Sequence, residues 1–342
     1  MVRALEWIDS ANALRVIDQT LLPAQERYLD ITTVDDLVDA IRSLAVRGAP
    51  ALGAAGAFGV VIAMNEAVGD GWDEARLASE VDRIRRARPT AVNLAWGVEQ
   101  AWLLAPQGVT ATLAKAKQVM TEDEAANRRL SKLGADWLLN RCGRNSVSVV
   151  THCNTGGLAT TAWGTAYGII HELHRRGSLT LAYSDETRPL LQGARLTCWE
   201  FTQDGIPFVV QADGAASSTI LNGRVDAAII GADRIAANGD TANKIGSVAL
   251  ALACQRKGIP FIVAAPFSTV DLAIASGDEI AIEERDQKEV LEFSGVRTTP
   301  PNAVGFNPAF DVTPYDLISA IVTERGVIEP AGHGNSLSSL AI

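Results

Sequence analysis

The chain has 342 residues, 47% hydrophobic and 20% charged, with a formal net charge of −10, which fits a globular protein of one large or two ordinary domains. The acidic balance disfavours nucleic-acid partners, and the longest apolar tract, 49–64, contains glycines and is too short to predict a membrane span. Four widely spaced cysteines without a CxxC pair disfavour a disulfide framework or zinc site, and the charged N-terminus lacks the apolar core of a signal peptide, so we expect a cytoplasmic protein.

Helical patterns dominate the first 140 residues, after short strands and turns over 4–31. Thr33 or Asp35 is placed to cap a helix over 34–44. Pro50 suits the first turn of the next helix, which extends to about Ala67. Three glycines spaced three apart in that helix predict close packing against another backbone: Gly53, Gly56 and Gly59. Further helices are predicted over 73–87, 90–104 and 109–139, with Pro89 as a break.

From Ser146 onward, apolar β-branched runs alternate with helical patterns. The predicted strands are 146–151, 180–183, 207–211, 227–231 and 260–265, and the predicted helices are 159–176, 191–203, 215–221 and 244–257. Continuous Val/Ile runs separated by helices are typical of a parallel sheet covered on both faces. We therefore predict an α/β protein with a mostly helical domain over 1–140 and a Rossmann-like, doubly wound domain over 141–342. The tail 331–335 is predicted to be irregular.

The stretch 146–160 organises the rest of the chain, because a strand there ends abruptly in His152, Cys153 and Asn154. Gly156-Gly157 follows, and a helix is predicted from Leu158. Such a turn places polar groups at the carboxyl edge of a sheet, and free helix N–H groups can hold an anion such as phosphate. Cys153 lies at that position, where the alternative is an inert buried thiol.

The ends of the second and the fourth predicted strands also carry polar groups, in 183–192 and 231–244. Asp233 is a candidate catalytic residue there, the alternative being a turn or cap residue. Asn243 and Lys244 are predicted to open a helix, so a cation and free N–H groups form a candidate phosphate site. No G-x-G-x-x-G or Walker loop follows a strand, which disfavours a dinucleotide or nucleoside triphosphate site. We interpret His152 as a structural hydrogen-bonding residue rather than a base.

Several long motifs resemble those of one known family: Arg47–Pro50, Thr151–Thr160, Glu186–Thr197, Gly231–Gly246, Ala264–Asp271 and Asn307–Pro314. They resemble the S-methyl-5-thioribose-1-phosphate isomerases, whose wider family includes regulatory subunits of translation initiation factor 2B and ribose-1,5-bisphosphate isomerases. The resemblance implies an aldose–ketose isomerase of methionine salvage that acts on a sugar phosphate without a cofactor or metal, usually as a homodimer.

The resemblance also implies site residues. The catalytic pair maps onto Cys153 and Asp233. The substrate contacts map onto Arg47, Gly48, Ala49, Arg88, Gln192, Asn243 and Lys244. From the residues alone, Arg47 and Arg88 could equally be solvated surface cations. One departure from the family pattern is Asp213-Gly-Ala-Ala-Ser217, where an aspartate, a small polar residue and Met-Ala are expected; it could change which substituent is accepted at C5 of the sugar.

For the isomerase reading, we expect Cys153 and Asp233 to lie in an apolar setting that keeps both groups protonated near neutral pH. Hydrogen could move from C2 to C1 of the sugar as a proton through an enolate or as a hydride, and both routes remain open. The alternatives are an isomerase of 5-deoxyribose 1-phosphate or ribose 1,5-bisphosphate, a non-catalytic translation-factor-like regulatory subunit, and a redox or dinucleotide-binding α/β protein.

Overall fold

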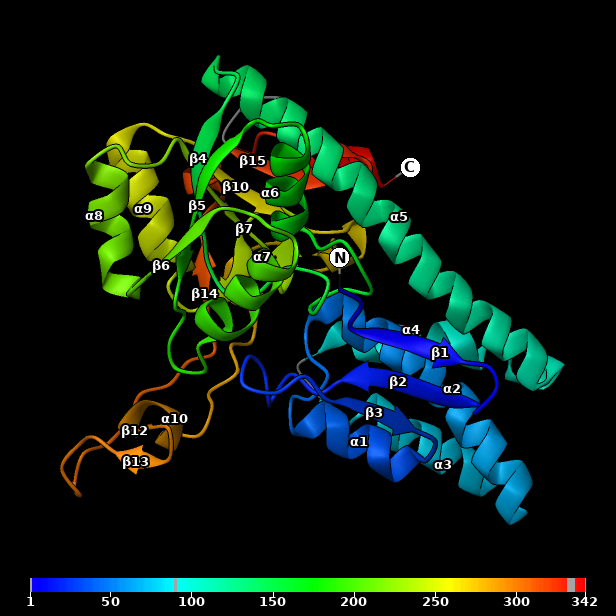
Figure 1. Cartoon of the computed structure of the whole chain (residues 1–342). Helices are drawn as coiled ribbons and strands as arrows, with labels where there is room; N and C mark the ends of the chain where they lie inside the picture. Colours follow the sequence, from blue (N-terminus) through cyan, green and yellow to red (C-terminus); the bar gives the residue numbers. More distant parts are fainter. Residues whose placement is uncertain (1, 89–90, 331–335, 342) are drawn as a thin grey trace. The chain divides into compact units, whose positions relative to one another are not determined.

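The structure is a computed structural model that describes residues 2–88, 91–330 and 336–341 (Figure 1). The chain forms two compact units, one made of Met1–Arg128 and Thr155–Gly164, the other of Arg129–Asn154 and Thr165–Ile342. These units divide after Arg128 and not at 140/141. They are defined by compactness, so the domain boundary at 140/141 stays a prediction. The predicted break at Pro89 and the predicted irregular tail 331–335 lie outside the described residues.

The first unit combines a small antiparallel sheet with helices, as predicted. Its sheet has the order β1-β2-β3. The strands are β1 (Leu5–Ile8), β2 (Ala13–Ile17) and β3 (Tyr28–Ile31), and the helices are α1 (Val34–Arg42), α2 (Ala49–Asp70), α3 (Glu74–Arg85), α4 (Val92–Trp102) and the first part of α5 (Val109–Cys142). The side chain of Thr33 caps α1 by accepting a hydrogen bond from the Asp36 N–H.

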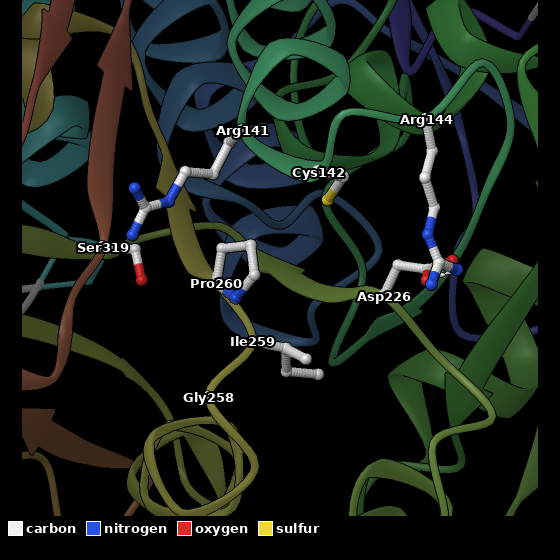
Figure 2. A pocket seen from close by; sticks show the side chains of 8 residues that line it. All are labelled: Arg141, Cys142, Arg144, Asp226, Gly258, Ile259, Pro260 and Ser319. Atoms are coloured by element: carbon white, nitrogen blue, oxygen red, sulfur yellow. Dashed lines mark hydrogen bonds and ion pairs between the residues drawn. The ribbon is translucent and has the colours of Figure 1, made fainter.

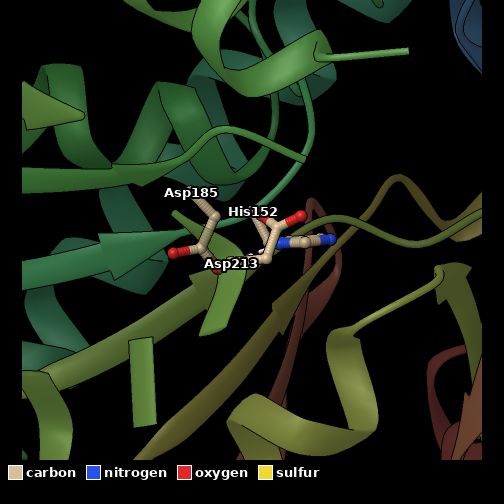
Figure 3. Close-up of side chains that lie close together, drawn as sticks. All are labelled: His152, Asp185 and Asp213. Atoms are coloured by element: carbon tan, nitrogen blue, oxygen red, sulfur yellow. Dashed lines mark hydrogen bonds and ion pairs between the residues drawn. The ribbon is translucent and has the colours of Figure 1, made fainter. Parts of the chain in front are cut away.

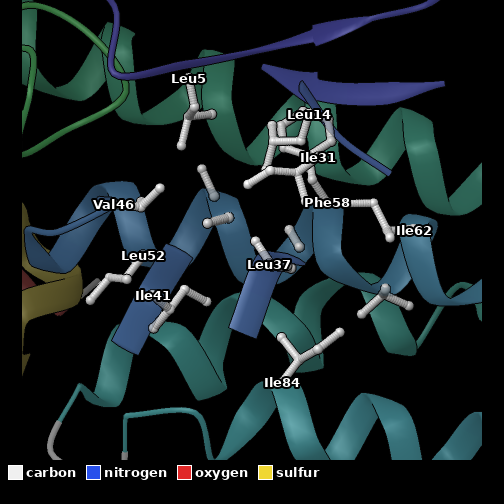
Figure 4. Packing of buried hydrophobic residues seen from close by; sticks show 14 of the residues in the cluster. Leu5, Leu14, Ile31, Leu37, Ile41, Val46, Leu52, Phe58, Ile62 and Ile84 are labelled. Atoms are coloured by element: carbon white, nitrogen blue, oxygen red, sulfur yellow. The ribbon is translucent and has the colours of Figure 1, made fainter. Parts of the chain in front are cut away.

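Helix α2 is the centre of the first unit. It is long and apolar enough to cross a membrane by length and composition, yet 83% of its apolar window is buried inside the protein, as in a core helix. Figure 4 shows Phe58 of α2 among side chains from the sheet and the neighbouring helices. A Cβ added to Gly97 of α4 would lie 1.8 Å from the Gly53 carbonyl oxygen, so the predicted close packing of the glycine-bearing helix is confirmed.

The second unit is built on a seven-stranded sheet with the order β16-β15-β10-β7-β4-β5-β6, parallel except for β16. The strands are β4 (Val147–Thr151), β5 (Leu179–Asp185), β6 (Phe208–Gln211), β7 (Ala227–Ile230), β10 (Phe261–Ala264), β15 (Ala320–Thr323) and β16 (Gly326–Ile328), and the helices are α6 (Ala166–Arg175), α7 (Cys198–Gln203), α8 (Ala216–Leu221) and α9 (Ser247–Lys257).

Both faces of this sheet are covered, which confirms the predicted doubly wound arrangement. Val149 packs in a core cluster with α6 and the last turns of α5, whereas the next residue, Val150, packs in a cluster with α8 and α9. In Figure 1, α8 and α9 lie together on one side of the sheet and α6 lies on the other. Because successive strand residues point to opposite faces, an unbroken Val/Ile run is the pattern that two covered faces require.

Two smaller sheets were not predicted. One has the order β11-β8-β9-β14, and the other is a hairpin of β12 with β13. Their strands are β8 (Arg234–Ala236), β9 (Thr241–Lys244), β11 (Val270–Asp271), β12 (Glu292–Phe293), β13 (Val296–Arg297) and β14 (Phe310–Thr313), and α10 (Lys288–Leu291) precedes the hairpin.

Two predicted helix starts are wrong. Residues 155–164 form turns rather than the start of a helix, and α6 begins only at Ala166. The hydroxyl of Thr161 bonds the Asp123 carboxyl at 2.7 Å in the first unit, and Trp163 has a positive φ of 74°, so distant contacts override the local helical pattern. Asn243 and Lys244 belong to strand β9, and α9 begins at Ser247.

Candidate active site

The carboxyl ends of β4 and β7 lie next to each other in the second unit, because the two strands are parallel neighbours and Val150 pairs with Ala228. Cys153 follows β4, and Asp233 follows β7. The sheet therefore brings both predicted catalytic residues to one edge, where open α/β sheets bind their ligands.

The backbone of Cys153 is fixed from two sides. Its φ is +63°, in the left-handed region that residues other than glycine rarely adopt. Its N–H donates to the Thr187 hydroxyl at 2.8 Å, and its carbonyl oxygen accepts from the Thr197 hydroxyl at 2.7 Å. The residue is buried, with 6% of its surface exposed. A strained residue held by two hydrogen bonds is typical of a pre-positioned functional group.

Asp233 differs from the prediction, because its side chain is exposed. Its N–H donates to the Ala242 carbonyl oxygen at 2.9 Å, which starts the pairing of β8 with β9. At this point the chain passes from β7 of the large sheet to β8 of the smaller one. Cys153 is thus buried as expected, whereas the expected burial is wrong for Asp233.

Asn243 and Lys244 lie on β9 with buried side chains. The Lys244 Nζ donates to the Ala309 carbonyl oxygen at 3.0 Å and lies 4.5 Å from the centre of the Phe310 ring. The Asp311 carboxylate accepts from the backbone N–H groups of Gly246, at 2.8 Å, and Val248, at 3.3 Å. These amides at the start of α9 therefore bind Asp311, so the prediction of free helix N–H groups for a phosphate is wrong here.

Gln192 carries a buried polar atom that has no hydrogen-bond partner in the part of the chain that the structure describes. The residue precedes a π-helical turn, Gly193–Thr197, and only 6% of its surface is exposed. Its Oε1 has no hydrogen-bond partner among the described residues. Buried polar atoms are nearly always hydrogen-bonded, and π-helical turns often mark functional sites. A donor from a bound ligand would satisfy this oxygen.

The first unit holds the other predicted contacts. The turn Arg47–Ala49, which is half-buried, lies against the segment 155–164. Gly48 has a φ of +94°, and a Cβ added there would lie 2.2 Å from the Ala159 carbonyl oxygen, so glycine is required for two reasons. The Ala51 N–H donates to the same oxygen at 3.3 Å. Arg88 is also half-buried and lies beyond the end of α3.

The structure confirms His152 as a hydrogen-bonding residue. Its ring is buried, with Nδ1 3.0 Å from Asp185 Oδ2 and Nε2 2.8 Å from the Ile245 carbonyl oxygen. The carbonyl only accepts, so we assign a proton to Nε2. Burial alone would lower the pKa of His152, but the hydrogen bond and charge of Asp185, with the charge of Asp213, raise it above its ordinary value.

His152, Asp185 and Asp213 also lie close enough to suggest a metal site, with their ligand atoms all within 4.8 Å (Figure 3). A metal requires an unprotonated ring nitrogen, whereas both nitrogens of His152 face acceptors. The two oxygens of Asp213 accept from the backbone N–H groups of Thr187 and Arg188, each at 2.7 Å. This donor set fits a hydrogen-bonded network better than a metal centre.

Residues 45–330 match the family described as the Initiation factor 2 subunit family. The chain belongs to this family.

Individual family members and solved structures resemble most of the chain. A probable bifunctional methylthioribose-1-phosphate isomerase/methylthioribulose-1-phosphate dehydratase of Nocardia farcinica is 49% identical over 95% of this chain, which spans 59% of that relative's length. The methylthioribose-1-phosphate isomerase of Alkalilimnicola ehrlichii is 48% identical, with 97% of this chain and 95% of the relative covered.

Two crystal structures share the fold at 38% identity. The 5-methylthioribose 1-phosphate isomerase of Pyrococcus horikoshii OT3 has a TM-score of 0.87 and covers 96% of this chain and 93% of its own. The translation initiation factor eIF-2B subunit delta of A. fulgidus has a TM-score of 0.84 and covers 96% of both chains. The resemblance inferred from the motifs is thus confirmed.

In this member of the Initiation factor 2 subunit family, a cavity of about 510 Å³ opens at the opposite, amino edge of the large sheet (Figure 2). Its lining consists of Arg141, Cys142, Arg144, Asp226, Gly258, Ile259, Pro260 and Ser319. Arg144 already pairs with Asp226 at 2.6 Å. None of the predicted site residues of the family lines this cavity, so it is separate from the candidate site.

Sequence reasoning missed three residues that contact the predicted site residues or the chain beside them: Thr187, Thr197 and Asp311. The two threonines hold the Cys153 backbone, and Asp311 accepts from the amides at the start of α9. Thr187 and Thr197 fall inside the motif Glu186–Thr197, so that motif was the available signal. Their partners are distant in sequence, and a local pattern does not reveal such bonds.

Proposed function

We propose that this protein is a methylthioribose-1-phosphate isomerase, which converts S-methyl-5-thio-α-D-ribose 1-phosphate into S-methyl-5-thio-D-ribulose 1-phosphate in methionine salvage. A family relative that is 48% identical along nearly the whole chain carries this name, and others at 45% carry it too. The observation that carries the proposal is the position of Cys153 and Asp233 after neighbouring parallel strands, at one edge of the sheet.

The chemistry requires two kinds of hydrogen transfer. A phosphate on C1 prevents spontaneous ring opening, so the enzyme must protonate the ring oxygen as the C1–O bond to that oxygen breaks. The C2–H bond then breaks, a C1–H bond forms, and the C2 hydroxyl loses its proton as the C2 carbonyl forms. The product is an isomer, so no oxidant or reductant is consumed. We assign these transfers to the Cys153 thiol and the Asp233 carboxyl group.

The remaining predicted residues would hold the substrate. Lys244, fixed by the Ala309 carbonyl, is a pre-positioned cation for the phosphate, with Arg47 and Arg88 as further candidates. Gln192 Oε1, which lacks a partner among the described residues, is suited to accept from a sugar hydroxyl. Asn243, the neighbour of Lys244 in the chain, donates to the Ser247 hydroxyl at 2.9 Å, and this hydrogen bond holds its side chain in place.

The test is turnover of three sugars by the purified protein without added cofactor: methylthioribose 1-phosphate, 5-deoxyribose 1-phosphate and ribose 1,5-bisphosphate. The ketone carbonyl is followed by carbon NMR. A methylthio group at C5 needs an apolar pocket, and a phosphate at C5 needs a further cation. The preferred sugar therefore shows whether the pocket around C5 is apolar or cationic. Methylthioribose 1-phosphate should give the largest kcat/KM. A ketone from none of the three would reject the isomerase.

A regulatory subunit is the second candidate, favoured by the TM-score of 0.84 to the structure described as eIF-2B subunit delta. Such a subunit does not need a catalytic pair, and this chain has both Cys153 and Asp233. Binding of a nucleotide without formation of any ketone would support the regulatory reading instead.

We also propose that the protein is a homodimer, as the resemblance implies, and that it is cytoplasmic, as expected from its four widely spaced cysteines. Light scattering of the purified protein should then give about twice the chain mass of 36.2 kDa. A mass equal to that of one chain at micromolar concentration would reject the dimer, and recovery in a membrane or secreted fraction would reject the location.

A further inference from the structure

We infer that His152 is a positioning residue that joins the loop carrying Cys153 to the turn after Lys244, and that it acts with protons on both ring nitrogens. This inference rests on the proposed function, because the groups it positions are the proposed catalytic thiol and the proposed phosphate-binding cation. The ring itself is buried and is not assigned a contact with the substrate.

The contacts of the ring define the connection. His152 directly precedes Cys153, and its Nε2 lies 2.8 Å from the carbonyl oxygen of Ile245, the residue after Lys244. On the other side, Nδ1 lies 3.0 Å from the carboxyl group of Asp185, the last residue of β5. One imidazole thus ties the ends of β4 and β5 to the end of β9.

A glycine makes room for this ring. A Cβ added to Gly246 would lie 3.0 Å from Cε1 and 3.1 Å from Nε2 of His152, closer than side chains normally pack. Gly246 also has a φ of +109°, which other residues rarely adopt. The turn after Lys244 therefore needs glycine to accommodate the imidazole, which indicates a specific packing contact between the turn and His152.

The partners determine the protons. A carbonyl oxygen cannot donate, so Nε2 carries a proton, and a lone pair on Nδ1 would face a carboxylate lone pair at 3.0 Å. A second proton between Nδ1 and Asp185 removes that repulsion. Three carboxyl groups act on the ring: Asp185 at the end of β5, Asp213 beyond β6 and Asp311 on β14. Gln211 donates to the other oxygen of Asp185 at 2.8 Å, which keeps that oxygen an acceptor.

The direct test is nitrogen NMR of the ring in protein labelled on histidine, at pH 7.5, about one unit above the ordinary histidine pKa of about 6.5. His152→Gln identifies the His152 signals by their loss, and His174→Gln is the control, since His174 is half-buried in α6 outside the site. Both ring nitrogens of His152 should give protonated signals. An unprotonated signal from either one would overturn the inference, whether or not the protein turns over the sugar.

Kinetics test the positioning role. His152→Phe removes both donors and should lower kcat/KM by about 100-fold, as expected when reacting groups shift by about 1 Å. His174→Gln should stay within about twofold of the parent. If His152→Phe does not fold, the NMR experiment and the variant Asp185→Asn still test the role of His152. Normal kcat/KM in a folded His152→Phe would overturn the positioning role.

Asp185→Asn tests whether His152 acts through its second ring proton or only through its packing. Asparagine still accepts from Nδ1 but carries no charge, so the ring loses the group that holds its second proton. The ratio of kcat/KM in this variant to that of the parent should rise as the pH falls from 8 to 5.5, because acid restores the missing proton. A ratio that does not change with pH would overturn the protonated form.

Discussion

The backbone of Cys153 has an unusual conformation that two hydrogen bonds hold in place. A left-handed conformation at a residue other than glycine is unfavourable by about 1–3 kcal/mol, and the hydroxyls of Thr187 and Thr197 stabilise it here. Each of these bonds contributes about 1 kcal/mol, which is comparable to the strain. The Cys153 backbone is therefore held in place before a substrate arrives, as catalysis by pre-positioned groups requires.

Replacement of either proposed catalytic group should remove most of the activity. Cys153→Ser and Asp233→Asn should each lose at least about 3 kcal/mol of transition-state stabilisation, about 150-fold in kcat/KM, while the fold survives. Steady-state kinetics and circular dichroism measure the two effects. Cys142→Ser is the thiol control, because Cys142 is half-buried at the opposite edge of the sheet. Near-normal turnover in either catalytic variant would exclude that residue from the chemistry.

Gln192→Leu should separate binding from stability. Leucine removes the buried Oε1 that lacks a partner among the described residues, so the free energy of unfolding should stay level or increase. The KM should rise by about tenfold, equal to the loss of one hydrogen bond to the substrate. Urea unfolding and initial rates provide the two values. A lower stability with unchanged KM would show that Oε1 serves the fold instead.

The helices of the first unit depend on glycine at their crossing. The α2 and α4 backbones approach so closely that Gly97 faces the carbonyl of Gly53, and Gly56 would place a Cβ 2.6 Å from the Leu94 carbonyl oxygen. Glycine disfavours a helix by about 0.5–1 kcal/mol relative to alanine, and the burial gained by close packing offsets this. The turn Arg47–Ala49 leads directly into α2, so this packing also supports a predicted part of the site.

Gly97→Ala should destabilise the protein by about 2–3 kcal/mol, because the new methyl group overlaps the Gly53 carbonyl and forces the helices apart. The same substitution at Gly69, near the end of α2, should stabilise the protein by about 0.5–1 kcal/mol, because nothing lies within 4 Å of the added Cβ. Thermal unfolding gives the melting temperatures of the two variants, which lie on the packed helices α2 and α4. Equal melting temperatures would contradict the packing argument.

Helix α6 carries a pH-dependent ion pair. Hydrogen bonds from Arg175 and Arg176 lower the pKa of the Glu172 carboxyl group to about 2, below its unfolded value of about 4.3. The ionised form is thus favoured by folding, so this contribution is present above about pH 4.3 and is lost as the pH falls towards 2. Glu172→Gln should destabilise the protein at pH 7, and the difference from the parent should shrink between pH 5 and pH 3.

Urea unfolding at pH 7, 5, 4 and 3 measures this difference. Asp39→Asn, which changes an exposed carboxyl group on α1, provides the control and should alter stability little at any of these values. A Glu172→Gln effect that is constant from pH 7 to pH 3 would show that packing, not ionisation, explains it.

For the molecule as a whole, the sequence predicts those features that depend on local periodicity. The Val/Ile runs identify the central parallel strands, and strand order then brings the residues after β4 and β7 to one edge. The predictions fail where partners lie far apart in the chain. Thr161 bonds Asp123 and thereby replaces a predicted helical turn, and Asp311 takes the amides expected to hold phosphate. The exposure of Asp233 likewise depends on the turn into a small sheet that local patterns did not indicate.

The inclusion of Thr155–Gly164 in the first unit has a consequence for biosynthesis. The Gln19 side chain, the Ala51 N–H and the Asp123 carboxyl all bind this short insert. Ribosomes add about 5–20 amino acids per second, so residues 129–164 take about 2–7 s to translate after the rest of that unit. The amino-terminal unit therefore cannot complete its contacts until Thr155–Gly164 has been translated, and by then translation of the second unit has already begun.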